Sequence, residues 1–453
     1  MAAERRYLAP AAWIAGGWSR DVLLVVGADG CWREVLADAP QARRADATHL
    51  AGPVIPGLVN AHSHAFQRAI AGLTERSAGG HDDFWSWRER MYAAALRITP
   101  QQMEAIAAHL YAELLATGYT HVCEFHYLHN APDGSAYDEP AEMALALVRA
   151  ARRVGIGLTL LPTLYMRSGF GAKGLRDEQR RFASTPESIA RIAGHIAAEA
   201  DGQVRAGLAV HSLRAVEEGA LREVAAMLAP GAPLHIHVAE QQQEVADCLE
   251  RHGERPIEWL LSHLPVDARW NLVHATQASR DELLGARAGG AAIVICPSTE
   301  ANLGDGVFDA PTWMGASGRW SIGSDSHVTR SWPEELRLLE YSQRLTLRQR
   351  NVAATAALAA STAAALFEGA LEGGSAAAGL PLAGIAVGQR ADFMVIDEAS
   401  PALLGVPREH LLDAIVFSSP DARVARVFVA GEETKPQQTA AAFVQAMHEL
   451  WPA

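Results

Sequence analysis

The sequence lacks features that would assign it to several large classes of protein. It has no run of lysine and arginine, and its formal net charge is −13, which argues against an extended surface for nucleic acid or for an anionic membrane. No stretch reaches the roughly 18 apolar residues of a membrane span, and the N-terminus has no sustained apolar segment typical of a secretory leader. We therefore expect a soluble cytoplasmic protein.

Paired cysteines are also missing, and lysine is scarce. The four cysteines form no Cys-x-x-Cys pair, so neither a disulfide framework nor a thiolate zinc site is indicated; they are Cys31, Cys123, Cys248 and Cys296. The only lysines are Lys173 and Lys435. An acidic substrate must therefore be bound by arginines.

Short β-rich segments alternate with longer segments of helical character through most of the chain. Eight such repeats predict an α/β fold, a (β/α)8 barrel. A doubly wound parallel sheet is the alternative, but nearly every β-rich segment ends in a polar residue, as expected for a site at the carboxyl face of a barrel. The predicted strands lie near residues 54–62, 119–127, 157–164, 206–212, 233–239, 270–275, 292–297 and 319–325.

Histidines stand at the ends of several predicted strands. The first strand ends in PGLVNAHSH, and because side chains alternate along a strand, His62 and His64 face the same side. Such a pair alone is more often exposed or hydrogen-bonded than metal-binding. Imidazole and carboxylate groups that meet at one barrel mouth favour a zinc site with an open position for water. The later strands bring such groups in PLHIHVAEQ (His237 and Glu240), NLVHATQ (His274) and SIGSDSH (Asp325).

These motifs resemble those of the amidohydrolase superfamily over nearly the whole chain. PGLVNAHSH, LLATGYTHV, HVAE, GSDSH and GIAVGQRADFMVID occur in the order found in that superfamily. The resemblance implies a catalytic barrel with a small β-sandwich domain built from both chain ends, and both ends are rich in short strands. We predict the N-terminal part of the sandwich at 1–53, the barrel at 54–380, the C-terminal part of the sandwich at 381–435 and a terminal helix at 436–453.

The resemblance also implies a metal site. Members with two ions commonly bridge them with a modified lysine on strand four, but strand four here reads RAGLAVHSLRA. We therefore expect one divalent ion per chain, zinc before other divalent metals, with the ligands His62, His64, His237 and Asp325. Glu124 is a weak candidate for a bridging carboxylate. His235 points the same way as His237 but lies one layer deeper, and we interpret it as a hydrogen-bonded core residue.

The polar groups around the ion indicate hydrolysis. Zinc lowers the pKa of bound water to about 7, so hydroxide is available near neutrality. Asp325 then accepts a proton, His274 stabilises the developing oxyanion, and Glu240 carries a proton to a nitrogen. The H-x-x-E spacing of His237 and Glu240 favours deamination, because ammonia is a poor leaving group unless its nitrogen is protonated.

Four segments, HSHAFQR, HSLRAV, HIHVAEQ and GSDSH, resemble the deiminases of this superfamily that act in histidine degradation. The resemblance implies hydrolysis of N-formimino-L-glutamate to N-formyl-L-glutamate and ammonia. Arg88 and Arg214 would bind the two substrate carboxylates through charge-assisted hydrogen bonds, although most arginines are solvated surface residues. Gln67, Tyr127 and His211 are further substrate contacts implied by the resemblance.

Other interpretations stay open. A nucleobase deaminase or an imidazolonepropionase, which acts on a heterocycle, would use much the same zinc ligands, and a non-catalytic scaffold is a third possibility. The segment GFGAKG (169–174) matches a dinucleotide-binding pattern, but no helix or suitably spaced acidic partner supports it, so we interpret it as a mobile loop over the barrel mouth. A homodimer is expected.

Overall fold

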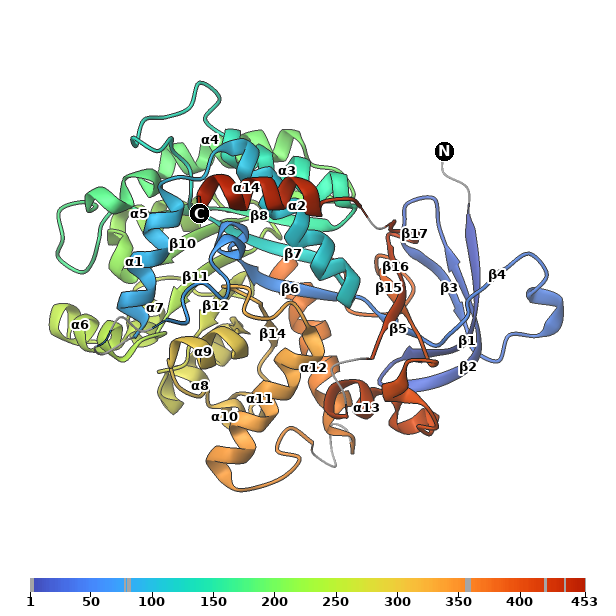
Figure 1. Cartoon of the computed structure of the whole chain (residues 1–453). Helices are drawn as coiled ribbons and strands as arrows, with labels where there is room; N and C mark the ends of the chain where they lie inside the picture. Colours follow the sequence, from blue (N-terminus) through green and yellow to red (C-terminus); the bar gives the residue numbers. More distant parts are fainter. Residues whose placement is uncertain are drawn as a thin grey trace.

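The computed structural model describes residues 4–76, 79, 83–354, 360–418, 422–435 and 437–452. The chain forms a barrel of parallel strands surrounded by helices, with a separate sheet to one side (Figure 1). Among the described residues, no helix is both long enough and apolar enough to cross a membrane.

The predicted (β/α)8 barrel is confirmed. Its strands pair in parallel in the order β14-β13-β12-β11-β10-β8-β7-β6, with the short β9 extending the fourth position beside β8. The ring closes between its first and last strands, where Asp325 N–H donates to His62 O over 3.0 Å. The strands are β6 (Leu58–Ser63), β7 (Tyr119–His126), β8 (Gly157–Leu164), β9 (Val204–Ala206), β10 (Leu208–Ser212), β11 (Leu234–Val238), β12 (Trp270–His274), β13 (Ala292–Ile295) and β14 (Trp320–Ile322).

One glycine permits this closure. A Cβ atom at Gly323, just after β14, would lie 2.5 Å from the Cβ atom of His62 and 2.9 Å from its backbone nitrogen. Any larger residue would therefore push the last strand away from the first. The glycine of the GSDSH motif thus brings Asp325 close to the two histidines of β6.

Helices cover the outside of the barrel, and local sequence signals set their ends. In α2, Thr99 and Gln102 form a reciprocal capping box, Pro100 occupies the first turn, and Gly118 ends the helix with φ +98°. The helices are α1 (Phe84–Ala95), α2 (Pro100–Thr117), α3 (Glu142–Val154), α4 (Pro186–Ala198), α5 (Glu218–Met227), α6 (Gln242–His252), α7 (Pro256–His263), α8 (Arg280–Gly289), α9 (Pro297–Leu303), α10 (Ala310–Gly315), α11 (Trp332–Leu347), α12 (Thr362–Ala378), α13 (Leu411–Phe417) and α14 (Ala440–Leu450).

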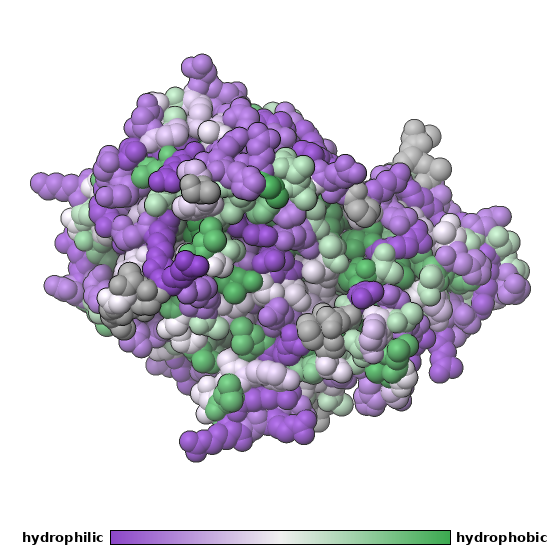
Figure 2. Space-filling view, in the orientation of Figure 1, coloured by the Kyte–Doolittle hydropathy of each residue, from purple (hydrophilic) through white to green (hydrophobic). Residues whose placement is uncertain are grey.

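The two chain ends form one curled sheet beside the barrel, in the order β17-β16-β15-β5-β1-β2-β3, with β4 paired to β1. Its own core contains Trp32, Phe393 and Phe428. Hydrophobic residues gather on the visible face where this sheet meets the barrel (Figure 2). The strands are β1 (Arg5–Ile14), β2 (Gly17–Val26), β3 (Trp32–Leu36), β4 (Thr48–His49), β5 (Val54–Pro56), β15 (Phe393–Ile396), β16 (Val424–Val429) and β17 (Glu432–Glu433).

The structure divides the strand that we predicted near 54–62. Residues 54–56 are β5, which pairs with β1 and β15 in the terminal sheet, and the barrel strand begins only at Leu58. The terminal helix α14 packs on the barrel rather than on the sheet. His109 of α2 stacks on Phe443, and Trp451 Nε1–H donates to Ala69 O. Residues 436 and 453, at the ends of the predicted segment 436–453, lie outside the described residues.

Candidate active site

The polar residues predicted at the strand ends lie together at the carboxyl face of the barrel. His62 and His64 come from β6 and its end, His237 from β11 and His274 from β12, while Asp325 follows β14. All are buried. His274 and Asp325 also have left-handed backbone conformations, with φ of 70° and 46°. Such conformations are uncommon for residues other than glycine and tend to cluster at functional sites.

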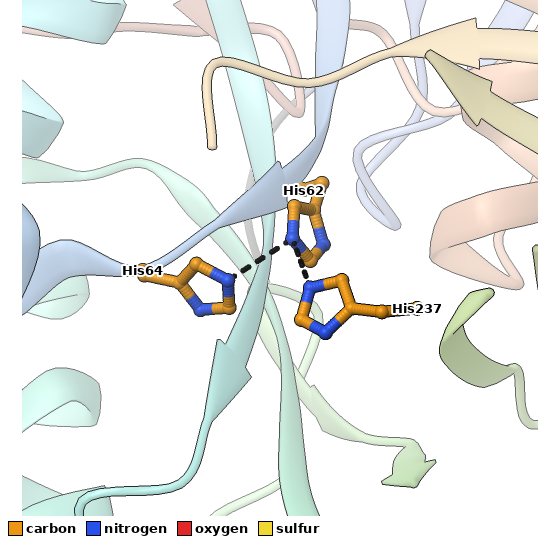
Figure 3. Close-up of side chains that lie close together, drawn as sticks. All are labelled: His62, His64 and His237. Carbon is orange, nitrogen blue, oxygen red and sulfur yellow. Dashed lines mark hydrogen bonds between the residues drawn. The ribbon is translucent and has the colours of Figure 1, made fainter. Parts of the chain in front are cut away.

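Three histidine rings converge on one point (Figure 3). His62 Nε2 lies 3.1 Å from His64 Nε2 and 2.9 Å from His237 Nε2. The opposite ring nitrogens of two of them are hydrogen-bonded to backbone: His64 Nδ1 to Phe125 O over 2.8 Å, and His237 Nδ1 to His211 O over 3.0 Å. A carbonyl can only accept, so these Nδ1 atoms carry the protons and the Nε2 lone pairs point to the shared centre.

Charge at this centre favours a cation. Burial lowers the pKa of His62 to about 3 and lowers that of His64 and His237, so the rings are neutral at physiological pH. Burial alone would raise the pKa of Asp325, but its contact with His62 and the surrounding histidines hold it below its usual value. Asp325 Oδ1 lies 3.4 Å from His62 Nε2 and 3.3 Å from His64 Nε2.

The donor set fits a divalent metal ion. Two nitrogens bound to one tetrahedral zinc at roughly 2.0–2.1 Å would be roughly 3.3 Å apart, close to the observed Nε2–Nε2 distances of 3.1 and 2.9 Å. Neutral imidazoles, two of them with a tautomer fixed by a backbone carbonyl, and an ionised carboxylate are the protonation states that such an ion requires. His62, His64 and His237 form one His-rich candidate metal-binding group, and His62, His274 and Asp325 form another that overlaps it.

Carboxylates surround His274. Its Nε2 lies 3.7 Å from Glu240 Oε1 and 3.9 Å from Asp325 Oδ2, while its Nδ1 lies 3.3 Å from Glu300 Oε1. Burial opposes charge on the ring, but the three carboxylates prevail and raise the pKa of His274 to about 10. Burial raises the pKa of Glu240. Proton donors and acceptors thus lie together beside the candidate metal ligands.

One cavity opens onto this centre, and every predicted substrate-binding residue lines it. These residues are Gln67, Arg88, Tyr127, His211 and Arg214, alongside His64, His237, Glu240, His274 and Asp325. His62 does not line the cavity and lies beneath it. Gln67 Nε2–H donates to Tyr127 OH over 3.1 Å, so these two side chains form one polar edge.

The two arginines give the cavity a positive wall. Both are largely buried, and Arg88 Nε and Arg214 Nη1 have no hydrogen-bond acceptor among the described residues. The nearest carboxylate to Arg214 is Glu244, 3.8 Å away. Burial lowers the pKa of Arg88, and the charge of Arg214 lowers it further. Two like charges held close together with unused N–H groups favour an anionic ligand.

Aromatic residues that the sequence analysis did not identify complete the cavity. Tyr92, Tyr165 and Phe182 line it, and Trp85 stacks on Arg88 with the guanidinium carbon 4.4 Å from the ring centroid. The aromatic run FWSW directly before Arg88 could have predicted the contact between Trp85 and Arg88. Glu300 was also missed, because nothing in its spacing links it to the other motifs.

Glu124, His235 and the segment 169–174 do not line the cavity. Glu124 accepts hydrogen bonds from Ser63, Ala65 N–H and Tyr111, and burial raises its pKa to about 7, so it has a structural environment rather than a bridging position. His235 Nε2 is hydrogen-bonded to Ala377 O of α12, as expected for a core histidine. Within the segment 169–174, Phe170 packs against His252 of α6.

Comparison with known proteins agrees with this geometry. Residues 54–434 match the model of the amidohydrolase family. The chain is 45% identical over 448 residues to the formimidoylglutamate deiminase of Pseudomonas aeruginosa, covering 96% of this chain and 97% of that protein. It is also similar to the crystal structure of an amidohydrolase from Brucella melitensis, with a TM-score of 0.92 and 41% identity, covering 98% of this chain and 99% of that one.

A more distant structure shows the same fold. An adenosine deaminase from Xanthomonas campestris with bound zinc has a TM-score of 0.79 at 22% identity, covering 98% of this chain and 97% of that one. At that identity the likeness concerns the fold alone.

Proposed function

The chain belongs to the amidohydrolase family, and on that premise we propose that it hydrolyses N-formimino-L-glutamate to N-formyl-L-glutamate and ammonia, a step of histidine degradation. The observation that carries the choice of substrate is the pair Arg88 and Arg214 on the wall of the cavity that contains the candidate metal ligands. The relative from Pseudomonas aeruginosa with 45% identity has the same activity in its name. Four free cysteines, three of them buried, fit a cytoplasmic location.

Substrate binding follows from the cavity wall. Each guanidinium offers a fork of N–H donors to one carboxylate of the glutamate moiety, and burial strengthens such charge-assisted hydrogen bonds. Gln67, Tyr127 and His211 line the same cavity as the arginines and the histidine centre. Binding of both carboxylates would hold the formimino carbon over that centre, which converts binding energy into orientation.

His62, His64, His237 and Asp325 would hold one divalent ion, zinc before other divalent metals, and when bound the ion supplies Lewis-acid activation of the attacking water. Asp325 accepts a proton from that water as its oxygen forms a bond to the formimino carbon. The tetrahedral adduct that results has an oxygen and two nitrogens on one carbon. His274 Nε2, on the same side as Asp325, donates to the developing negative charge on the oxygen.

Ammonia departs in the second half of the reaction. Glu240, whose pKa is raised by burial, carries a proton to the terminal nitrogen. The carbon–nitrogen bond then breaks, a carbonyl forms, and the second proton of the water completes the ammonia. One water and one C=NH group therefore yield one C=O group and one NH₃. The position of Glu240 3.7 Å from His274 allows both residues to act on one adduct.

The test is ammonia release from a panel of substrates. The purified protein should act on formiminoglutamate with a higher kcat/KM than on cytosine, guanine or adenosine, and far higher than on a formamidine without carboxylates. The nucleobase compounds share the metal chemistry but offer no anion to the two arginines. A higher kcat/KM on any heterocycle would overturn the proposed substrate, and no ammonia release from any compound would favour a non-catalytic scaffold.

A further inference from the structure

Glu300 is a buried carboxylate that contacts a predicted catalytic group but not the cavity. It lies on α9, is 4% exposed, and does not line the cavity. Its Oε1 atom accepts a hydrogen bond from Cys296 N–H over 2.9 Å and lies 3.3 Å from His274 Nδ1. The hydrogen bond from Cys296, the N-cap residue of the same helix, fixes the position of the carboxylate. The fixed carboxylate can therefore orient the ring of His274.

The backbone of His274 does not by itself set the direction of its ring. With φ of 70° the residue has left the strand conformation of β12, and the following Ala275 also has a positive φ of 51°. The ring stacks on His237 with an interplanar angle of 18°, which restrains its plane. A half-turn about the Cβ–Cγ bond would keep that plane but exchange the two edges of the ring, so which nitrogen faces the cavity depends on hydrogen bonds. Glu300 supplies the acceptor on the side away from Glu240 and Asp325.

We propose that Glu300 is a positioning residue that acts through His274. By accepting the Nδ1–H of His274, it holds Nε2 towards Glu240 and Asp325, where the reacting oxygen forms. A ring without this acceptor would lose the contact that holds its orientation. This inference rests on the proposed hydrolysis, in which His274 donates to the developing oxyanion.

Three variants test this role. Glu300→Met keeps the length of the side chain but removes the acceptor, so kcat should fall about 10- to 100-fold, the usual effect of removing such a partner. KM should change little, since Glu300 does not line the cavity. Glu300→Gln keeps an amide oxygen, which Cys296 N–H orients towards His274, and should lose less than about 10-fold. Glu300→Asp keeps the charge but withdraws the oxygen, and should resemble Glu300→Met.

Glu335 provides the matched control. It is also a fully buried carboxylate that anchors α9, accepting hydrogen bonds from Ser298 N–H and Ser298 Oγ–H over 2.9 and 2.6 Å, but it does not contact His274. Glu335→Gln should therefore leave kcat within about threefold of the unmodified enzyme. Thermal midpoints and metal content of all variants are measured in parallel, because a merely structural effect would lower these first.

The variants are compared on whichever compound of the panel the unmodified enzyme turns over fastest. No ammonia release from formiminoglutamate would thus contradict the proposed substrate without affecting this comparison. An unchanged kcat in Glu300→Met would overturn the positioning role. Should that variant not fold, the same result in Glu300→Asp would overturn it. Equal losses in Glu300→Gln and Glu300→Asp would also contradict it, because only the former can reach His274.

Discussion

At the scale of single residues, the position of Glu240 leads to the first prediction. Its carboxylate faces His274 across 3.7 Å inside the cavity, and burial raises its pKa, which suits a group that carries a proton. Glu240→Gln keeps the size of the side chain but removes this function. We expect kcat for ammonia release to fall by roughly 10² to 10⁴, with metal content unchanged by elemental analysis. Turnover close to that of the unmodified enzyme, at full metal content, would remove Glu240 from the mechanism.

The two arginines lead to the second prediction. Replacing either Arg88 or Arg214 by methionine leaves one substrate carboxylate without its partner. The loss should be about 2–4 kcal/mol, or roughly 30- to 1000-fold in kcat/KM for formiminoglutamate. Part of the loss should appear in kcat, because the carboxylates also orient the formimino carbon. Steady-state kinetics and metal content are the measurements.

A formamidine without carboxylates is the control for this experiment, since it offers no anion to either arginine. Equal losses on both substrates would mean that the arginines support the fold or the metal site instead. The structure also predicts different thermal midpoints for the two arginine variants. Arg214 is the cation nearest to the buried Glu244, so Arg214→Met should lower the thermal midpoint as well, whereas Arg88 makes no ion pair among the described residues.

Single residues also show how far the sequence alone could lead. The convergence of His62, His64, His237 and Asp325 was predictable because strand ends meet at one face of a barrel, and the place of the arginines in the cavity because the neighbouring motifs resemble a known family. Glu300 and Tyr165 were not predictable. Glu300 lies on α9, which follows β13, and it contacts His274 at the end of the neighbouring strand β12. The ring centroids of Tyr165 and His211 lie 4.2 Å apart. Such contacts depend on side-chain directions, and a strand pattern specifies only which face a residue occupies.

At the scale of elements, strand boundaries are where the sequence was least informative. The apolar run from Val54 to Val59 reads as one strand, yet it serves two sheets, with Gly57 between them. Both halves are buried, so hydrophobicity does not reveal the change of sheet. The alternation of strands and helices, in contrast, survives such errors, and the remaining predicted strands lie within a few residues of their observed positions.

The third prediction concerns the link between β7 and β8. His129, three residues after β7, is fully buried, and its Nε2–H donates to Thr163 O over 2.9 Å. Burial lowers its pKa to about 4. Because its pKa in the unfolded chain is higher, about 6.5, protonation favours unfolding. The stability that the neutral ring contributes is therefore complete above about pH 6.5 and is lost as the pH falls towards 4.

His129→Gln should remove this acid sensitivity. The glutamine amide can still donate to Thr163 O but does not titrate. Between pH 7 and pH 5 the free energy of unfolding should fall by about 2 kcal/mol less in the variant than in the unmodified protein. Urea unfolding at the two pH values, with metal content held constant, measures the difference. Parallel pH profiles for the two proteins would show that His129 has the same proton affinity in both states.

At the scale of the whole molecule, segments far apart in sequence meet around the barrel. Strand β5 lies between β1, near the start of the chain, and β15, near its end. Helix α14 then returns to the barrel (Figure 1). There Trp451 Nε1–H donates to Ala69 O in the segment that also carries Gln67. The family resemblance anticipated the terminal sheet. No pattern in the last residues indicated that the final helix packs beside the segment following the histidine pair.

The candidate metal ligands also come from distant parts of the sequence, and they lead to the last prediction. They come from β6, β11 and the segment after β14, so a bound ion would join three separate parts of the barrel. An ion that binds only the folded chain adds about 2.7 kcal/mol of stability at a free concentration one hundred times its Kd. Removal with a chelator should therefore abolish ammonia release and lower the thermal midpoint. Adding zinc back should restore both.

Elemental analysis gives the stoichiometry in the same experiment. We expect one divalent ion per chain, because the overlapping His-rich groups share His62 and strand four has no lysine to bridge a second ion. His237→Ala should lose both occupancy and the zinc-dependent rise in thermal midpoint, since one of three converging imidazoles is gone. A variant at Glu124 should keep its ion, because that carboxylate is occupied by Ser63, Ala65 and Tyr111. Two ions per chain in fully active protein would contradict this ligand set and return Glu124 to consideration as a bridge.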